Sequence, residues 1–281
     1  MTSFNNKPSI YDNSLEKYVR YCTLPIPFWF SSSEGLGFPM WALTNPTIGL
    51  NIELDNYTQN NISPGTTNNN SFTDNIIFDI ELLVNNVYLD NIEKNRFKLI
   101  PLEYYIDQPN IIEKIELTGN SFKKKIEIPK ENYVKYFIVN VTPNQKIGYN
   151  LDSTRYEFDS VEGINNLLIS VNGNLIFEGN SNFTSIINRY QNFKTPVTNK
   201  DIDNNTKGIN DMYIHTYSFC LDPLNYKSSG FLTTTKFNNI NMEISGTLPS
   251  ITGINSYTLN IYQVKTNIIR INNGDLNILF N

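Results

Sequence analysis

The sequence lacks most of the side chains on which enzymes and metalloproteins depend. It contains a single histidine, His215, and two cysteines, Cys22 and Cys220, in 281 residues. One imidazole is too few for a zinc, iron or copper centre, and the two cysteines lack the close spacing of a zinc or redox motif. Two distant cysteines are also too few for a secreted disulfide framework, so we expect both to be reduced thiols. The sequence predicts no metal site and no cofactor.

Charged residues are scarce as well, at 17% of the chain, and the net charge is -5. Non-specific binding to phosphates needs clustered Lys and Arg, so we expect no direct nucleic-acid partner. No apolar run approaches the roughly 18 residues of a membrane span, which predicts no transmembrane segment. The polar start, Met1 to Tyr11, lacks the apolar region of a secretion signal. We therefore expect a protein that is made and folded in a cytosol.

Alanine occurs once, at Ala42, whereas asparagine occurs 45 times and isoleucine 35 times. An AT-rich coding sequence explains part of this bias. The loss of the best helix former, together with many Ile, Val, Thr, Tyr and Phe residues, favours strands. The apolar fraction of 40% is enough to bury one large or two mid-sized cores. The predicted fold class is all-β.

Short apolar runs separated by turn residues recur at intervals typical of β-sandwiches and barrels. They predict strands over residues 24–30, 38–43, 47–54, 75–84, 111–117, 123–128, 134–142, 166–171, 175–177, 212–221, 231–235, 240–245, 256–264, 268–271 and 276–280. Asn172-Gly173 predicts a type I′ hairpin, because both central residues of that turn need positive φ. The Asn- and Thr-rich stretches 58–73 and 198–211 predict long surface loops.

Two short helices are expected. Asp90 followed by Glu93 predicts an N-cap that opens a helix over 91–99. A second helix is predicted over 183–193, with an apolar face formed by Phe183, Ile186, Ile187 and Tyr190. The segment 90–110, which contains Pro101 and Pro109, is the expected boundary between two β units.

The candidate catalytic and ligand-binding patterns have simpler explanations. His215 alternates with Ile214 on a predicted strand, and we expect a partly exposed strand histidine there without a nucleophile to serve. The GxSxG elbow of acyl hydrolases is absent. The loop from Asp201 to Met212 begins like a calcium loop, but Thr206 and Met212 replace the glycine and glutamate that such a loop requires.

Three other patterns are also expected to have no binding or catalytic role. Gly35-Leu-Gly37 lacks the third glycine of a dinucleotide site and predicts a turn. The run Lys123 to Lys125 predicts a solvated face, with either its middle or its outer members in solvent, that Glu116, Glu127 and Glu131 can offset. Six N-glycosylation sequons, at Asn56, Asn61, Asn69, Asn140, Asn182 and Asn204, are expected by chance in a chain so rich in Asn, Ser and Thr.

One long segment resembles a motif of a known family. Leu24-Pro-Ile-Pro-Phe-Trp-Phe-Ser-Ser-Ser-Glu-Gly-Leu-Gly-Phe-Pro-Met-Trp-Ala-Leu43 is similar to the "LPFFF" and "GLALP..AL" runs of the double jelly-roll major capsid proteins of large eukaryotic DNA viruses. Val87-Tyr-Leu-Asp90 with Glu93 and Arg96-Phe97 looks like that family's "YLD..ER..F" element, which lies between its two barrels. Glu103 to Gln108 stands where "EYLIEQ" is usual.

Further matches keep the family's order. Val171-Asn-Gly173 with Phe177 and Arg189-Tyr190 resembles "NG..RF....YF", Ile214 to Thr235 resembles "YSFAL.P....PSG..N.SR", and Asn267 to Gly274 resembles the closing "NVLRI..G". The chain departs from the pattern at three places, which are Ser228, Thr235-Lys236 and Asn45-Pro46. These departures affect loop and trimer contacts more than the fold.

The resemblance implies a jelly-roll β-sandwich, a double jelly roll whose first barrel is incomplete. Residues 1–100 would hold the last strands of the first jelly roll and a short inter-barrel helix, and residues 101–281 the second jelly roll. It implies a non-enzymatic structural component of the virion capsid, assembled in the host cytoplasm as homotrimers that tile an icosahedral shell and contact minor capsid proteins. The aromatic residues Trp29, Trp41 and Tyr217 would be core or interface anchors.

A barrel that lacks strands leaves unpaired edges and an uncovered apolar face, so residues 1–100 are expected to need strands from another chain or an upstream segment. Three other functions remain open from the sequence. A scaffold-type double jelly roll of immature particles would share the fold. A glycan-binding β-sandwich and a carboxylate-dependent hydrolase are the alternatives from other classes.

Overall fold

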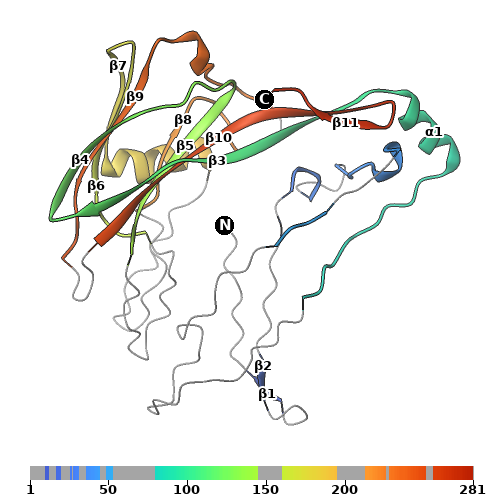
Figure 1. Ribbon diagram of the computed structural model, residues 1–281, viewed down its shortest axis with the longest axis horizontal. Helices are drawn as coiled ribbons and strands as arrows, with labels where there is room; N and C mark the ends of the chain where they lie inside the picture. Colours follow the sequence, from blue (N-terminus) through green and yellow to red (C-terminus); the bar gives the residue numbers. More distant parts are fainter. Residues whose placement is uncertain are drawn as a thin grey trace.

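The computed structural model describes residues 10–12, 17–19, 26, 28–31, 36–44, 49–52, 80–144, 160–194, 213–225, 228–250 and 256–280. The predicted loops 58–73 and 198–211, and the calcium-like pattern from Asp201, lie outside these residues. Most of the regular structure falls after residue 100 and is β-sheet (Figure 1). The prediction of an all-β fold is confirmed.

Eight strands form a sandwich of two antiparallel sheets. One sheet has the order β3 (Leu102–Thr118), β10 (Ser256–Asn272), β5 (Val134–Pro143) and β8 (His215–Ser218). The other has the order β4 (Ser121–Glu127), β9 (Ile240–Thr247), β6 (Ile164–Val171) and β7 (Asn174–Asn180). Each sheet therefore mixes early and late strands of the chain, as a jelly roll does.

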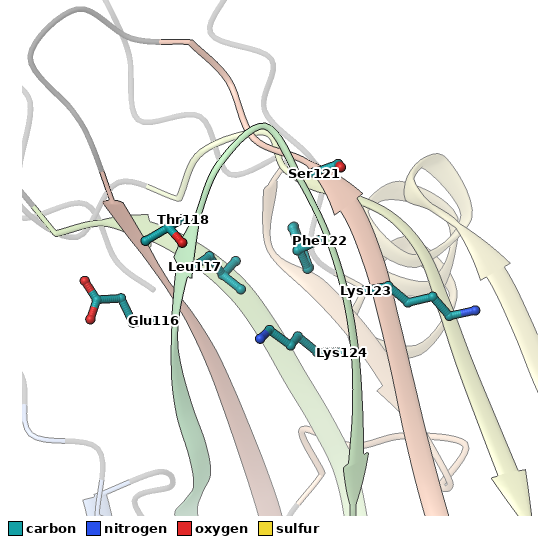
Figure 2. A pocket seen from close by; sticks show the side chains of 7 residues that line it. All are labelled: Glu116, Leu117, Thr118, Ser121, Phe122, Lys123 and Lys124. Atoms are coloured by element: carbon teal, nitrogen blue, oxygen red, sulfur yellow. The ribbon is translucent and has the colours of Figure 1, made fainter.

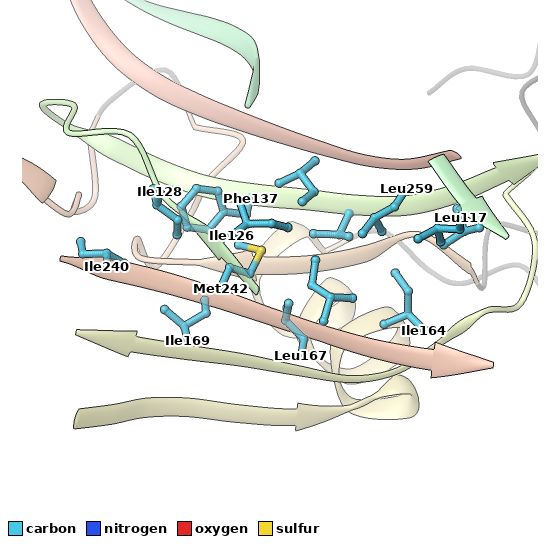
Figure 3. Packing of buried hydrophobic residues seen from close by; sticks show 14 of the residues in the cluster. Leu117, Ile126, Ile128, Phe137, Ile164, Leu167, Ile169, Ile240, Met242 and Leu259 are labelled. Atoms are coloured by element: carbon cyan, nitrogen blue, oxygen red, sulfur yellow. The ribbon is translucent and has the colours of Figure 1, made fainter. Parts of the chain in front are cut away.

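The core lies between these two sheets. Along β5, alternation places Phe137, Val139 and Val141 on the inner face, and all three are fully buried. Met242 and Ile244 of β9 face them from the other sheet with no exposed surface (Figure 3). Each such side chain stabilises the fold by about 1.5–3 kcal/mol relative to exposure, so this layer supplies much of the stability.

Strands β3 and β10 continue beyond the sandwich as a two-stranded ribbon (Figure 1). The predicted strands 256–264 and 268–271 are one continuous strand, β10, which pairs with β3 from Ser256 to Ile271. The far end of β10 turns at Asn273-Gly274 into β11 (Asp275–Ile278). Both turn residues have positive φ, 53° and 89°, as a type I′ hairpin needs.

The predicted hairpin at Asn172-Gly173 is confirmed, with φ values of 49° and 83° between β6 and β7. The helix α1 (Asn91–Leu99) is confirmed with its predicted start. The carboxylate of Asp90 accepts a hydrogen bond of 2.8 Å from the backbone N–H of Glu93.

The second helix lies where it was predicted, over residues 183–193, but its type and its buried face differ from the prediction. It consists of two π-helical turns, η4 (Phe183–Ile187) and η5 (Arg189–Phe193). The expected apolar face is largely outside: Phe183, Ile187 and Tyr190 are exposed, whereas the polar Thr184, Ser185, Asn188 and Arg189 are buried. The helix lies against a strand edge whose backbone and side chains offer hydrogen bonds, so its polar face is turned inward.

Several predicted strands are wrong. Where the structure describes 24–30 and 38–43, it has the 3-10 turns η1 (Trp29–Ser31) and η2 (Met40–Ala42). Pro25, Pro27 and Pro39 interrupt these runs, and proline cannot donate to a ladder. Residues 49–52, 80–84 and 231–235 are also outside strands, apart from a single bridge at Leu232. Two short strands not foreseen, β1 (Ile10–Asp12) and β2 (Lys17–Val19), pair with each other.

Candidate functional site

The described part of the chain contains no group of three or more His, Cys, Asp or Glu residues able to hold a metal ion. None of its helices has the length and apolar content to cross a membrane. Cys220 is a buried free thiol, as expected of a reduced cysteine, and Cys22 lies outside the described residues. The features of interest are instead the places where the motif segments meet.

The first meeting place is the far half of the ribbon, which we call the junction. The described residues of segment 26–44 pack there against Ile106 of β3 and Ile269 and Ile271 of β10, burying Ala42. The ring centroids of Trp29 and Tyr104 are 4.3 Å apart, and Trp41 contacts Phe97 of α1 edge-on at 5.2 Å. The predicted anchors Trp29 and Trp41 are therefore partly buried side chains that pack against this small cluster.

Gly274 explains why the closing motif ends on glycine. Its φ of 89° suits glycine, and a Cβ added there would lie 1.7 Å from Oγ1 of Thr44. The backbone N–H of Thr44 donates a 3.0 Å hydrogen bond to the carbonyl oxygen of Gly274. The first and last motifs of the sequence are thus joined at the tip of the ribbon.

An extended stretch before α1 exposes many apolar side chains. We call Leu82, Leu83, Val84, Val87 and Tyr88 the apolar strip; Leu83 is 79% and Tyr88 89% exposed. Helix α1 continues this surface, because it buries no side chain and leaves Ile92 and Leu99 in solvent. So many adjacent apolar residues on a surface are typical of an interaction site.

The second meeting place joins the helix η4–η5 to the edge strand β8. His215 is 1% exposed, so the prediction of a partly exposed histidine is wrong. Its Nδ1 lies 2.7 Å from Oγ1 of Thr184. The Thr184 hydroxyl also lies 3.0 Å from the carbonyl oxygen of Asn180 and 3.2 Å from that of Ser181, so it joins the imidazole to the start of the helix.

Burial, with a smaller contribution from the Arg189 guanidinium, lowers the pKa of His215 to about 4. The imidazole is therefore neutral at pH 7. Asn188 also donates to the backbone oxygen of Thr216 on the same strand. The third predicted anchor, Tyr217, lies on β8 and contacts Phe177 at 4.2 Å between ring centroids. The helix thus covers the edge of the sheet with specific bonds.

The loop after β8 is closed on itself. The backbone N–H of Asp222 donates to Oγ of Ser229 at 2.8 Å, and that hydroxyl donates back to the Asp222 carbonyl oxygen. Gly230 follows with φ of 142° and little room for a Cβ beside Phe219. Ser229-Gly230 of the motif therefore close a turn.

An ion pair that sequence reasoning missed supports this loop. Lys135 is 1% exposed, and its Nζ lies 2.9 Å from both carboxylate oxygens of Asp107. Burial raises the pKa of Asp107, and the Lys135 ammonium opposes that shift. Because Asp107 lies on β3 and Lys135 on β5, the pair links two strands and reaches the Asn225 carbonyl oxygen at 3.4 Å. No local pattern signals this contact.

Lys123 and Lys125 are exposed, and Lys124 between them is partly buried. This agrees with the prediction that either the middle or the outer lysines face solvent. Lys123 pairs at 2.7 Å with Glu243 of β9, however, and the expected partner Glu131 pairs with Lys265 at 3.0 Å. Two of the six sequons fall on described residues: Asn140 is partly buried in β5, and Asn182 lies in the first turn of the helical segment at residues 181–193. Gly37 lies outside regular structure, and Gly35 lies outside the described residues.

Two solved structures show which class of fold this is. The chain matches the PBCV-1 virus capsid with a TM-score of 0.52 and 18% identity, over 69% of this chain and 55% of that one. It matches PBCV-1 VP54, fitted into a reconstruction of the virophage Sputnik, with a TM-score of 0.53 and 17% identity, over the same shares. The fold is that of the viral jelly-roll capsid proteins.

A curated relative narrows this class. The chain is 23% identical over 264 residues to the "Major capsid protein" of Pyramimonas orientalis virus, a match that covers 89% of this chain and 59% of the relative. The chain thus spans less than two thirds of that relative's length. No family model matches the sequence. The resemblance to the major capsid proteins of large DNA viruses is confirmed.

Proposed function

We propose that the chain acts as a major capsid protein of a large DNA virus and is a structural part of the virion shell. The observation that carries this proposal is the meeting of the ordered motifs at the junction. Residues 28–31 and 36–44, Phe97 of α1 and residues 267–274 come from three separate motifs, yet they meet at one end of the ribbon. A joint built from aromatic and aliphatic side chains is suited to an architectural role.

Within that function, we propose that residues 1–100 belong to a first jelly roll and residues 101–281 form the second. The eight-strand sandwich supports the second half of this division. The apolar strip supports the first half, since its leucines and valines need cover that the described chain does not supply. Strands of the first barrel, from an upstream segment or another chain, would cover it.

Further parts of the proposal concern assembly. Two barrels per chain would let a homotrimer present a pseudo-hexagonal outline, with minor capsid proteins as further partners and assembly in the host cytoplasm. No enzymatic activity is proposed, in keeping with the relatives, which are named as capsid proteins. No direct contact with nucleic acid is proposed either, given the net charge of -5.

The test is the assembly state of the purified chain, alone and with the N-terminal segment of a full-length relative supplied in trans. Negative-stain images and sedimentation should show trimers, and Val87→Asp should reduce them. Ile176→Asp, which changes an exposed side chain on β7, is the matched control. A protease-resistant monomer over residues 1–100, with or without the added segment, would contradict the proposal. Clear glycan binding by a monomer would favour a lectin instead.

A further inference from the structure

One face of β10 is apolar at both ends and polar in the middle. The apolar ends belong to the sandwich core and to the junction, through Ile261 and Ile269 respectively. By alternation, the side chains between them on the same face are Gln263, Lys265 and Asn267. Gln263 and Asn267 are each only 1% exposed. The two apolar clusters are therefore separated by a largely buried polar stretch.

The strands that flank β10 are irregular at the same place. β3 has an extra residue, Ile112, and β5 has an extra residue, Lys135, each opposite the regular part of β10 between Ile261 and Lys265. Such bulges bend a strand and interrupt its ladder locally. Within the described ranges β3 pairs only with β10, and a hollow of about 250 Å³ lies beside the hairpin that joins it to β4 (Figure 2). The backbone is therefore suited to bend at the polar stretch.

The side chain of Gln263 adds a cost to the observed arrangement. In the part of the chain that the structure describes, neither the oxygen nor the nitrogen of its amide has a hydrogen-bond partner. A buried amide without partners is destabilising, and a bend at this point would admit water to it. Other contacts must therefore hold the ribbon in its observed position.

The residues that follow β11 supply such contacts. β5 and β11 lie along the same edge of β10, where β5 pairs as far as Lys265 and β11 pairs from Ile269 onward. Asn267 lies at the gap between them. Its side-chain amide donates to the carbonyl oxygen of Phe280 and accepts a 3.0 Å hydrogen bond from the Phe280 backbone N–H. The same amide donates at 3.0 Å to Gln108 of β3, so it joins both neighbours of β10.

The ring of Phe280 closes the gap on the other side. Its centroid lies 4.5 Å from that of Tyr133, which precedes β5. The Tyr133 carbonyl oxygen accepts a 2.9 Å hydrogen bond from the backbone N–H of Thr266 on β10. The backbone N–H of Leu279 donates at 3.0 Å to the carbonyl oxygen of Ile268. Residues 279–280 thus connect the end of β11 to the start of β5 across the polar stretch.

We propose that Leu279–Phe280 form a strap that holds the ribbon at a fixed angle to the sandwich, and that Asn267 is the residue that positions this strap. When the strap is released, the ribbon bends at the polar stretch and the junction moves with it. The proposal concerns the conformation of the chain and does not depend on the capsid function.

The test follows the angle through one distance in the full 281-residue chain. Spin labels are attached at Glu178→Cys on β7 and at Asp275→Cys at the tip of the ribbon, two exposed positions. The parent chain also carries Cys22→Ser and Cys220→Ser, so that only these two positions are labelled. Double electron–electron resonance gives the distribution of the distance between the labels, and we expect a single narrow distance in the parent.

Asn267→Leu removes the side-chain bonds to Phe280 and should broaden this distribution beyond its width in the parent. The Phe280 amide should also exchange its hydrogen at least about tenfold faster, because its bond to Asn267 is lost. Asn277→Leu is the matched control, since it makes the same exchange at an exposed position of β11. The control should leave both the distribution and the exchange rate unchanged.

A second variant decides the outcome if circular dichroism shows that Asn267→Leu does not fold. Phe280→Ala keeps Asn267 and removes only the ring that packs on Tyr133, and it should broaden the distribution in the same way. A distribution as narrow as that of the parent in the deciding variant, even with faster exchange at residue 280, would show that the strap only covers the ribbon. That result, or equal broadening in Asn277→Leu, overturns the proposal.

Discussion

The sandwich and the junction are both held by apolar contacts, but they bury very different amounts of surface. The sandwich encloses seventeen buried apolar residues between two sheets, and the junction only four. The sandwich also contains every strand needed to close its own topology. The junction, in contrast, is contacted by a helix, α1, that has no fully buried residue. We infer that the sandwich folds by itself and that the N-terminal region depends on partners for its stability.

The largest difference between the two regions is expected when a side chain at the centre of the sandwich is truncated. Phe137→Ala should lower the free energy of unfolding by about 3–5 kcal/mol, because it leaves a cavity in a fully buried site. Trp29→Ala at the junction should leave the main thermal transition in place and affect only residues near segment 26–44. Calorimetry with hydrogen exchange measures both. Equal losses of global stability would show that the two regions fold as one unit.

Acid should act on the sandwich and spare the junction. The pKa of His215 is lowered from 6.5 to about 4 in the folded state, so the unfolded chain binds a proton first as pH falls. The free energy of unfolding is therefore highest above about pH 6.5. It falls by about 3 kcal/mol as the pH is lowered toward 4. Urea unfolding at a series of pH values measures it. His215→Gln should flatten this slope, and an unchanged slope would contradict the assignment.

The junction can be opened without disturbing the sandwich. Gly274→Ala puts a Cβ against Thr44 and strains a positive φ, which should release segment 26–44 at a local cost of about 2 kcal/mol. Gly119→Ala is the control, because Gly119 has a similar φ of 88° and nothing within 4 Å of an added Cβ. Limited proteolysis should cut near segment 26–44 only in Gly274→Ala. Equal cleavage in both variants would mean that cleavage near segment 26–44 does not depend on the contact between Gly274 and Thr44.

The smallest effect is expected at α1. Asp90→Ala removes the N-cap and should destabilise this helix by about 1 kcal/mol, seen as faster exchange of the Glu93 amide. The melting temperature of the sandwich should not move. A global shift would show that α1 is more tightly coupled to the sandwich than its exposed side chains indicate.

Local chemistry allowed the sequence to predict some elements well. The Asn172-Gly173 turn, the Asp90 cap and the inner face of β5 each depend on residues adjacent in the chain, so their patterns could be read directly. Strands were predicted wrongly where apolar residues pack against another part of the fold without pairing in a sheet. Segment 38–43 is an example, because it contains a 3-10 turn that packs on the ribbon.

The candidate sites were harder to predict, because their partners are distant in sequence. His215 is buried by a helix about thirty residues earlier, and Lys135 is paired with a carboxylate on another strand. Neither partner can be chosen from a linear pattern.

The continuity of β10 has a mechanical consequence. A strand of 17 residues spans about 55 Å, and here it passes without a break from the core of the sandwich to the tip of the ribbon. A force applied at the junction along the ribbon would load the hydrogen bonds to β3 in shear, all together, and not one after another as in peeling. The ribbon would therefore resist a pull along its length, and in the capsid function proposed above it would pass strain between neighbouring units without unfolding them.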